Sequence, residues 1–221
     1  MKVYAQYFEI DNMIYRVNTI LQFGDSWKLI GNAVLANPGS ATPIKEINDN
    51  VEKELQAFYK NFIDRNLDLK NWFEFSDDQT RQRIEKIFNG WYINQENPTN
   101  LNGIIQLFNT FNVKNQNLAQ AIEKLPIYNK FLFSDGIEKY FNDKPTYFGF
   151  SSDIIYNERL RPIAESIFCR SSKIIKQLYN DDFSKNSFYH PTFINRSYKR
   201  EFFQKYMTNI LIPFHKLVVN S

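Results

Sequence analysis

Residues 27–39, WKLIGNAVLANPG, decide the fold expected for this chain. The stretch Trp27–Ala36 is apolar enough to form a buried strand, and Asn37-Pro38-Gly39 then ends that strand in a sharp turn. A strand that is buried along its length is typical of a parallel sheet covered on both faces. We therefore expect the Asn37 carboxamide at the carboxyl end of a central strand, where open α/β sheets place their binding sites.

Strand and helix patterns alternate along the rest of the chain. We expect an edge strand at residues 13–23 and further strands at 103–108 and 146–150, and two segments, 173–179 and 187–189, also fit short strands. Helices are expected at residues 49–63, from 76–78 to 90, and at 117–125, 158–169 and 197–211. This alternation predicts an α/β fold, a three-layer α/β/α sandwich with a central, mostly parallel sheet. The length of 221 residues suits a single domain, 1–221.

The composition indicates a protein of the reducing cytoplasm. With 27 basic and 24 acidic residues the formal charge is +3, which excludes a strongly basic tail but leaves room for a local basic face. The single cysteine, Cys169, excludes both an intrachain disulfide and a four-cysteine iron–sulfur cluster, and we expect it to be buried. The N-terminal residues lack the apolar run of a signal peptide, and no run is long enough to span a membrane. We expect a cytoplasmic monomer with no membrane partner.

A second informative segment, His190-Pro191-Thr192-Phe193-Ile194, follows the first by about 150 residues. A lone histidine is more often structural than catalytic, and His215, in an apolar C-terminal segment, is expected to be structural. The surroundings of His190 differ, because a proline, a hydroxyl residue, two apolar side chains and then a basic stretch follow it.

The two segments together resemble the catalytic motifs of the uracil-DNA glycosylase superfamily. Leu35-Ala36-Asn37-Pro38-Gly39 resembles the Gly-x-Asn-Pro-Gly motif of the thymine- and mismatch-directed branches, with Leu35 in place of glycine. The segment 190–194 resembles the motif His-Pro-Ser-Pro-Leu, with Thr192 for serine and Phe193 for the second proline. The resemblance spans residues 27–206. It implies a uracil-DNA-glycosylase-like fold that flips a base out of DNA and hydrolyses its N-glycosidic bond.

The resemblance also implies roles for single residues. Asn37 would orient the attacking water, since a carboxamide cannot titrate and so cannot act as a general base. His190 would donate a hydrogen bond to the base oxygen that becomes negative as the bond breaks. Ile194, next to Phe193, would enter the duplex in place of the extruded base. Ser197 would cap the following helix, and DNA phosphates would lie near this helix start and its cations, which are Arg196, Lys199 and Arg200.

The residue that reads the base is expected within residues 104–110, IIQLFNT. Asn109 followed by Thr110 resembles the uracil-specific branch, whereas Gln106-Leu107-Phe108 resembles a related group of uncharacterised bacterial domains, which residues 78–84, DQTRQRI, resemble as well. Strand alternation cannot direct both Gln106 and Asn109 into one pocket, and we favour Asn109. Phe75 is a candidate for stacking on the flipped base, with core packing as the alternative, and Gly39 would let the backbone approach the ligand closely.

The sequence leaves the substrate open. No lysine nucleophile, cofactor or metal site is evident, so we expect a monofunctional glycosylase. Because the motifs depart from the uracil-specific pattern and the segment 39–77 is long enough to enlarge the pocket, we expect a modified pyrimidine, for example a hypermodified phage cytosine removed in antiviral defence. The alternatives are a repair glycosylase for uracil or mismatched thymine, a catalytically silent nucleic-acid-binding module, and an enzyme acting on free nucleosides or nucleotides.

Overall fold

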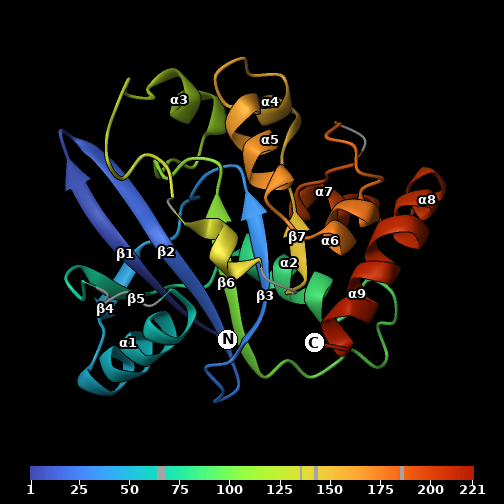
Figure 1. Ribbon diagram of the computed structural model, residues 1–221, viewed down its shortest axis with the longest axis horizontal. Coiled ribbons are helices and arrows are strands. Elements are labelled where there is room, and N and C mark those ends of the chain that lie inside the picture. The colour runs from blue at the N-terminus through green and yellow to red at the C-terminus, as the bar shows by residue number, and fades with distance from the viewer. Residues whose placement is uncertain (64–67, 135, 142–143, 185–186) are drawn as a thin grey trace.

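The computed structural model describes residues 1–63, 68–134, 136–141, 144–184 and 187–221. Within these residues, seven strands form one mixed sheet in the order β4-β5-β1-β2-β6-β3-β7 (Figure 1). The strands are β1 (Lys2–Ile10), β2 (Met13–Phe23), β3 (Leu29–Leu35), β4 (Pro43–Glu46), β5 (Trp72–Phe75), β6 (Gly103–Asn109) and β7 (Thr146–Phe148).

The strands β6, β3 and β7 form a parallel unit at one side of the sheet. In this unit Leu35 pairs with Asn109, and Val34 pairs with Phe148. Both β3 and β6 are buried almost throughout, which explains why their sequences are nearly continuous apolar runs. The expected buried strand before Asn37 is therefore confirmed as β3, the middle strand of the unit.

The remaining pairings are antiparallel, so the expectation of a mostly parallel sheet is wrong. β1 and β2 form a hairpin through Asp11 and Asn12, whose φ angles of 53° and 59° suit a two-residue turn with the twist of the strands. β2 pairs with β6 on its other side, so residues 13–23 form an inner strand and not an edge strand. This hairpin is difficult to predict from the sequence because Asp-Asn lacks the glycine that usually marks such a turn.

Helices pack against both faces of the sheet (Figure 1). On one face a Cβ at Gly31 of β3 would lie 2.5 Å from the Phe88 ring, so glycine is needed for helix α2 to approach. On the other face Phe148 of β7 contacts Phe168 of α5, with ring centroids 5.3 Å apart. The helices are α1 (Asp49–Ile63), α2 (Gln79–Phe88), α3 (Leu118–Glu123), α4 (Ser152–Ile155), α5 (Arg161–Cys169), α6 (Lys173–Leu178), α7 (Pro191–Ser197), α8 (Gln204–Tyr206) and α9 (Ile212–Val219). The coarse α/β prediction is thus confirmed.

Several C-terminal expectations are wrong. Residues 173–178 form helix α6, capped by Ser172, and residues 187–189 form no strand. The single helix expected at 197–211 is replaced by α7, a short 3-10 turn at Glu201–Phe203, and a continuous run of α8, a π-helical turn at Met207–Leu211 and α9. The π-helical turn precedes Pro213, whose missing N–H it accommodates without ending the helix. Cys169, expected to be buried, is exposed at the end of α5.

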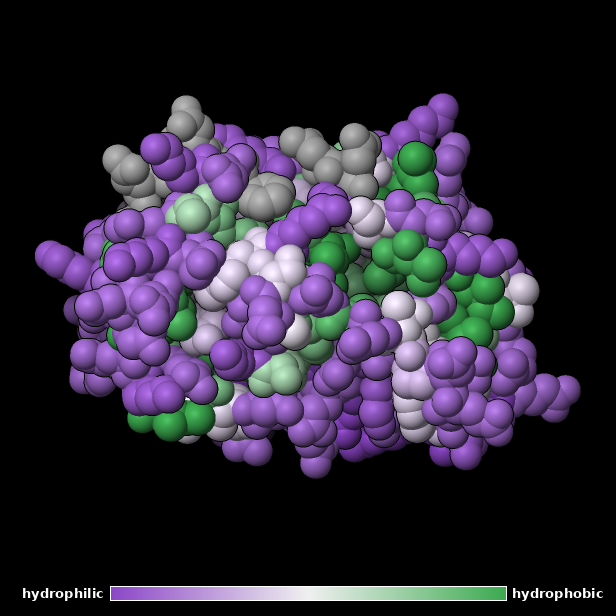
Figure 2. Space-filling view, turned by 90° about the horizontal axis from the view of Figure 1, so that it is seen from below, coloured by the Kyte–Doolittle hydropathy of each residue, from purple (hydrophilic) through white to green (hydrophobic). Residues whose placement is uncertain are grey.

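Figure 2 shows the molecule from the end opposite the carboxyl ends of β3 and β6. Hydrophilic residues dominate this face, and hydrophobic residues gather mainly on the side of the C-terminal helices. In the part of the chain that the structure describes, no helix combines the length and apolar character needed to cross a membrane.

Candidate functional site

The loops that follow β3 and β6 are joined to each other at the upper end of the sheet (Figure 1). The backbone N–H of Thr110 donates to the carbonyl of Leu35 at 2.8 Å, and the N–H of Asn115 donates to that of Pro38 at 3.1 Å. The two chain segments therefore leave the sheet as one hydrogen-bonded unit. This unit fixes the position of the residues that follow each strand.

A cavity of about 300 Å³ lies at this end of the sheet. Four residues that the sequence singled out line it: Asn37, Gly39, Asn109 and His190. The other described residues in its wall are Arg16, Leu35, Ala36, Asp78, Thr80, Arg81, Leu107, Asn115, Gln116, Leu118 and Ser151. Of the long segment 39–77, Gly39 alone among the described residues contributes to this wall, so the described part of the segment does not enlarge the cavity as expected.

The carboxamide of Asn37 is held by its nitrogen. Nδ2 donates to the carbonyl oxygens of Asn115 at 3.0 Å, Pro38 at 3.1 Å and Val113 at 3.4 Å. The Oδ1 atom accepts no hydrogen bond from any residue that the structure describes. Because the nitrogen is anchored to the backbone, the carbonyl oxygen remains available to accept a hydrogen bond from a water or a ligand.

His190 is the residue that begins helix α7. Pro191 occupies the first turn, where its missing N–H costs nothing, and the Nδ1 of His190 accepts from the backbone N–H of Thr192 at 3.2 Å. Burial, and secondarily the charge of Arg83, lowers the pKa of His190 to about 4. The imidazole is therefore neutral at pH 7, and because Nδ1 accepts, its proton lies on Nε2. Nε2–H is then a neutral hydrogen-bond donor.

Asn109 and Gln106 lie on opposite faces of β6. Asn109 lines the cavity, is 4% exposed, and its side chain makes no hydrogen bond within the described residues. Gln106 is fully buried on the other face, where Nε2 donates to the carbonyl of Thr19 at 3.0 Å and the Tyr59 hydroxyl donates to Oε1 at 3.4 Å. Gln106 is therefore a structural residue, and of the two expected base readers only Asn109 reaches the cavity.

Phe75 does not fit the role of a stacking platform. It is 3% exposed, at the end of β5, and it is absent from the described part of the cavity wall. The guanidinium groups of Arg16 and Arg81 lie 5.6 and 5.8 Å from its ring centroid. The buried ring therefore packs against two arginine side chains, and the core-packing alternative holds for Phe75.

The segment after His190 differs from its expected roles at two positions. Ile194 is fully buried within α7, so in this structure it cannot enter a duplex. Ser197 is 2% exposed in the last turn of α7, so it neither caps a helix nor reaches a phosphate. Both expectations fail because the helix starts at Pro191 and not near Ser197, which turns these side chains toward the core.

The exposed positions of this segment are Phe193 and the three expected cations. Phe193 is 40% exposed and its ring stacks on Tyr189, with centroids 4.8 Å apart. Arg196, Lys199 and Arg200 are all exposed. An exposed aromatic ring and three exposed cations thus follow the cavity residue His190 in the sequence.

Sequence reasoning gave the charged and hydroxyl groups of the cavity wall no role in the site. Arg16 interrupts the apolar strand β2, and this isolated charge is the signal that could have identified it. Asp78 lies where the sequence predicts the start of a helix, and it caps that helix, since its Oδ1 accepts from the N–H of Arg81 at 2.9 Å. The hydroxyl of Ser151, just after β7, is buried with no hydrogen-bond partner in the described residues.

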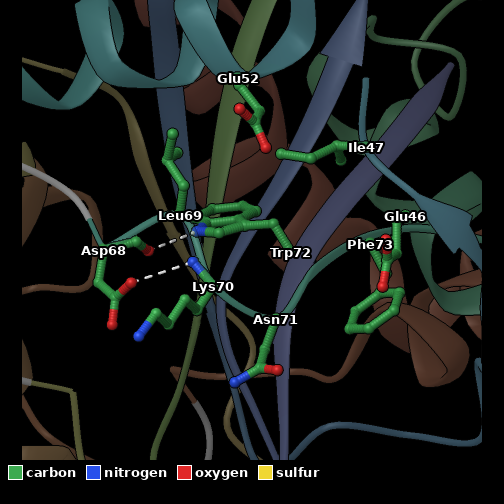
Figure 3. A pocket seen from close by; sticks show the side chains of 9 residues that line it. All are labelled: Glu46, Ile47, Glu52, Asp68, Leu69, Lys70, Asn71, Trp72 and Phe73. Atoms are coloured by element: carbon green, nitrogen blue, oxygen red, sulfur yellow. Dashed lines mark hydrogen bonds between the residues drawn. The ribbon is translucent and has the colours of Figure 1, made fainter. Parts of the chain in front are cut away.

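A larger hollow of about 490 Å³ lies elsewhere, beside the edge strand β4 and its neighbour β5 (Figure 3). None of the residues predicted to be functional is among the described residues that line it. Its hydrogen bonds serve the local loop: Trp72 Nε1 donates to the Asp68 carbonyl at 3.2 Å, and the Lys70 N–H donates to Asp68 Oδ1 at 3.0 Å. We therefore take the smaller cavity as the candidate site.

Among the described residues, no group of three or more His, Cys, Asp or Glu side chains could hold a metal ion. No protein-family model matches the chain, and no curated protein or solved structure matches it significantly. The function is therefore inferred from the residues of the cavity.

Proposed function

We propose that this protein is a monofunctional DNA glycosylase with a uracil-DNA-glycosylase-like fold, which flips a pyrimidine-type base out of DNA and leaves an abasic site. The observation that carries the proposal is that Asn37, Asn109 and His190, distant in sequence, line one cavity at the carboxyl end of the parallel strands. A volume of about 300 Å³ lies at the lower end of the range for ligand pockets, which suits a single base.

The neutral His190 acts on the leaving base. As the N-glycosidic bond breaks, negative charge develops on the carbonyl oxygen of the base next to the bond, and Nε2–H donates a hydrogen bond to it. The donor is fixed by the contact of Nδ1 with Thr192, so no reorganisation is needed in the transition state. A neutral donor also avoids the cost of burying an imidazolium, a cost that is reflected in its lowered pKa.

The Oδ1 of Asn37 positions the attacking water on the sugar carbon. Its carboxamide cannot take up the proton of this water, so Asn37 supplies orientation alone, and the proton passes to the base that departs as an anion. The amide of Asn109, whose donor and acceptor are both unused within the described residues, hydrogen-bonds the edge of the flipped base. Gly39 adds backbone to the wall, and a Cβ at that position would meet nothing within 4 Å, which leaves space for a ligand.

Outside the cavity, Phe193 takes over the role expected of Ile194 and enters the gap that the extruded base leaves. Arg196, Lys199 and Arg200 contact the DNA phosphates. The protein acts as a cytoplasmic monomer without cofactor or metal. Because Asn37 and Phe193 depart from the uracil-specific motifs, its base is a modified pyrimidine such as a hypermodified phage cytosine, and the activity serves antiviral defence.

An abasic-site cleavage assay tests this function. Oligonucleotides that carry uracil, mismatched thymine or glucosylated hydroxymethylcytosine are incubated with the protein and then with alkali, which cuts at abasic sites. Cleavage at the modified cytosine supports the full proposal, whereas cleavage at uracil or thymine alone contradicts the modified-base assignment. Binding of DNA without cleavage of any substrate identifies a silent nucleic-acid-binding module instead.

A further inference from the structure

Two buried arginines line the candidate cavity. Arg16 comes from the inner strand β2 and Arg81 from the first turns of α2, and their exposed fractions are 2% and 1%. Their guanidinium groups lie near the same aromatic ring, that of Phe75, at 5.6 and 5.8 Å from its centroid. Arginine is rarely buried to this extent unless a partner neutralises it.

The described residues do not supply enough partners for the two guanidinium groups. Arg16 makes one long hydrogen bond, from Nη1 to the carbonyl of Ala41 at 3.5 Å, and its Nε has no partner. Arg81 donates from Nη1 to the carbonyl of Ser76, while its Nε and Nη2 have no hydrogen-bond partner. Each unpaired buried donor costs free energy that a ligand could recover.

The charges around the pair do not balance either. Asp78 provides the only carboxylate among the described residues of the cavity wall, and its Oδ2 lies 3.7 Å from Arg81 Nε, beyond hydrogen-bond length. Burial, and then the charge of Arg81, lowers the pKa of Arg16 to about 9. Burial, and then the charge of Arg16, lowers the pKa of the half-buried Lys114. Guanidinium groups stay charged at neutral pH, so the described wall holds two positive charges, on Arg16 and Arg81, against the single negative charge of Asp78.

We propose that the cavity binds its ligand through an oxyanion held between Arg16 and Arg81. The ligand therefore carries an acidic group, which is either a carboxylate on the pyrimidine ring or a phosphate of the nucleotide. Guanidinium groups recognise both groups through paired N–H donors, and the hydroxyl of Ser151 supplies a further unused donor in the same wall. The identity of the rest of the ligand, a pyrimidine, rests on the proposed function, whereas the anion site does not.

Thermal unfolding in the presence of matched ligand pairs tests the inference. The first pair is orotate and uracil, which share a ring but differ in the carboxylate. The second pair is deoxyuridine monophosphate and deoxyuridine, which differ in the phosphate, and inorganic phosphate is compared with chloride at equal ionic strength. A ligand at about 100 times its Kd should raise Tm by roughly 5–11 °C for a chain of this size.

We expect the charged member of at least one pair to raise Tm more than its neutral counterpart, and the pair that responds identifies the source of the oxyanion. In Arg81→Gln and Arg16→Gln this extra rise should disappear, whereas Arg170→Gln, at an exposed arginine paired with Glu138, should retain it. Two variants are used so that a folding failure in one does not end the test.

Equal shifts with charged and neutral ligands, or no shift with any anion at millimolar concentrations, would overturn the inference. An unchanged response in both cavity variants would overturn it as well. These outcomes are independent of base release. Anion binding without abasic-site formation would support the anion site and contradict the glycosylase function. Base release without any response to anions would support the glycosylase function and contradict the anion site.

Discussion

Acidification should destabilise this protein through His190. Burial disfavours the imidazolium and lowers the pKa of His190 in the folded protein to about 4, from an ordinary value of 6.5. Above pH 6.5 the imidazole is neutral in both the folded and the unfolded state and contributes no pH dependence. As the pH falls from 6.5 toward 4, the unfolded chain binds a proton that the folded protein does not, so stability falls.

The size of this effect follows from the two pKa values. Between about pH 7.5 and about pH 5, the contribution of His190 to the free energy of unfolding should fall by about 2 kcal/mol, approaching about 3 kcal/mol below pH 4. Other groups also titrate in this range, so the effect must be isolated by substitution. His190→Asn suits this purpose, because asparagine is a good N-cap and can accept from the same N–H of Thr192.

Urea unfolding of the wild type and of His190→Asn at both pH values measures the contribution. The wild type should lose about 2 kcal/mol more than the variant on acidification. His215→Asn, which removes the other histidine, serves as the control for the loss of an imidazole elsewhere. Equal losses in the wild type and His190→Asn would refute the claim that His190 is held neutral in the cavity wall.

Three further substitutions test other parts of the structure. Asn37→Asp should lower the free energy of unfolding by about 2 kcal/mol or more, because a carboxylate oxygen would face the three carbonyls that Nδ2 now binds, and urea unfolding at neutral pH with Asn37→Ala as the comparison measures this. Phe193→Ala should weaken binding to a duplex with an extrudable base, measured by fluorescence anisotropy, while Tm changes little because the ring is 40% exposed; unchanged affinity would speak against its entry into the duplex. Gly31→Ala should cost about 2 kcal/mol or more, since its Cβ would lie 2.5 Å from Phe88 and 2.8 Å from a backbone carbonyl, and a Tm within a degree of wild type would contradict this close packing.

The sequence predicts best what depends on local pattern. The apolar run of β3 and the turn at Asn37 identify a central strand and its carboxyl end, and parallel strands bring such ends together. The cavity therefore contains Asn37, Asn109 and His190, as the motifs indicate. Strand alternation also separates Asn109 from Gln106 correctly, because side chains in a strand point to alternate faces.

The sequence predicts poorly what depends on tertiary packing. The antiparallel half of the sheet could not be predicted because the hairpin turn at residues 11–12 lacks glycine. Whether Ile194 is exposed depends on where α7 begins, and the start at Pro191 turns this side chain inward. Arg16 lies on a strand and Arg81 on a helix far along the chain. Their sequence patterns do not indicate that the fold places both charges in the same cavity wall.

The single-turnover rate of base release tests the central claim most directly. It is measured on the oligonucleotide that the wild type cleaves fastest, for the wild type, Asn37→Ala, His190→Ala and the control His215→Ala. Loss of a fixed hydrogen-bond donor in the transition state typically costs about 100-fold or more in rate, so His190→Ala should be slowed at least to this extent. Asn37→Ala loses the acceptor that orients the attacking water, and misplacement of a reactant can also cost about 100-fold, whereas the control should keep the wild-type rate. Absence of base release by the wild type on every substrate, or unchanged rates in both cavity variants, would contradict the account.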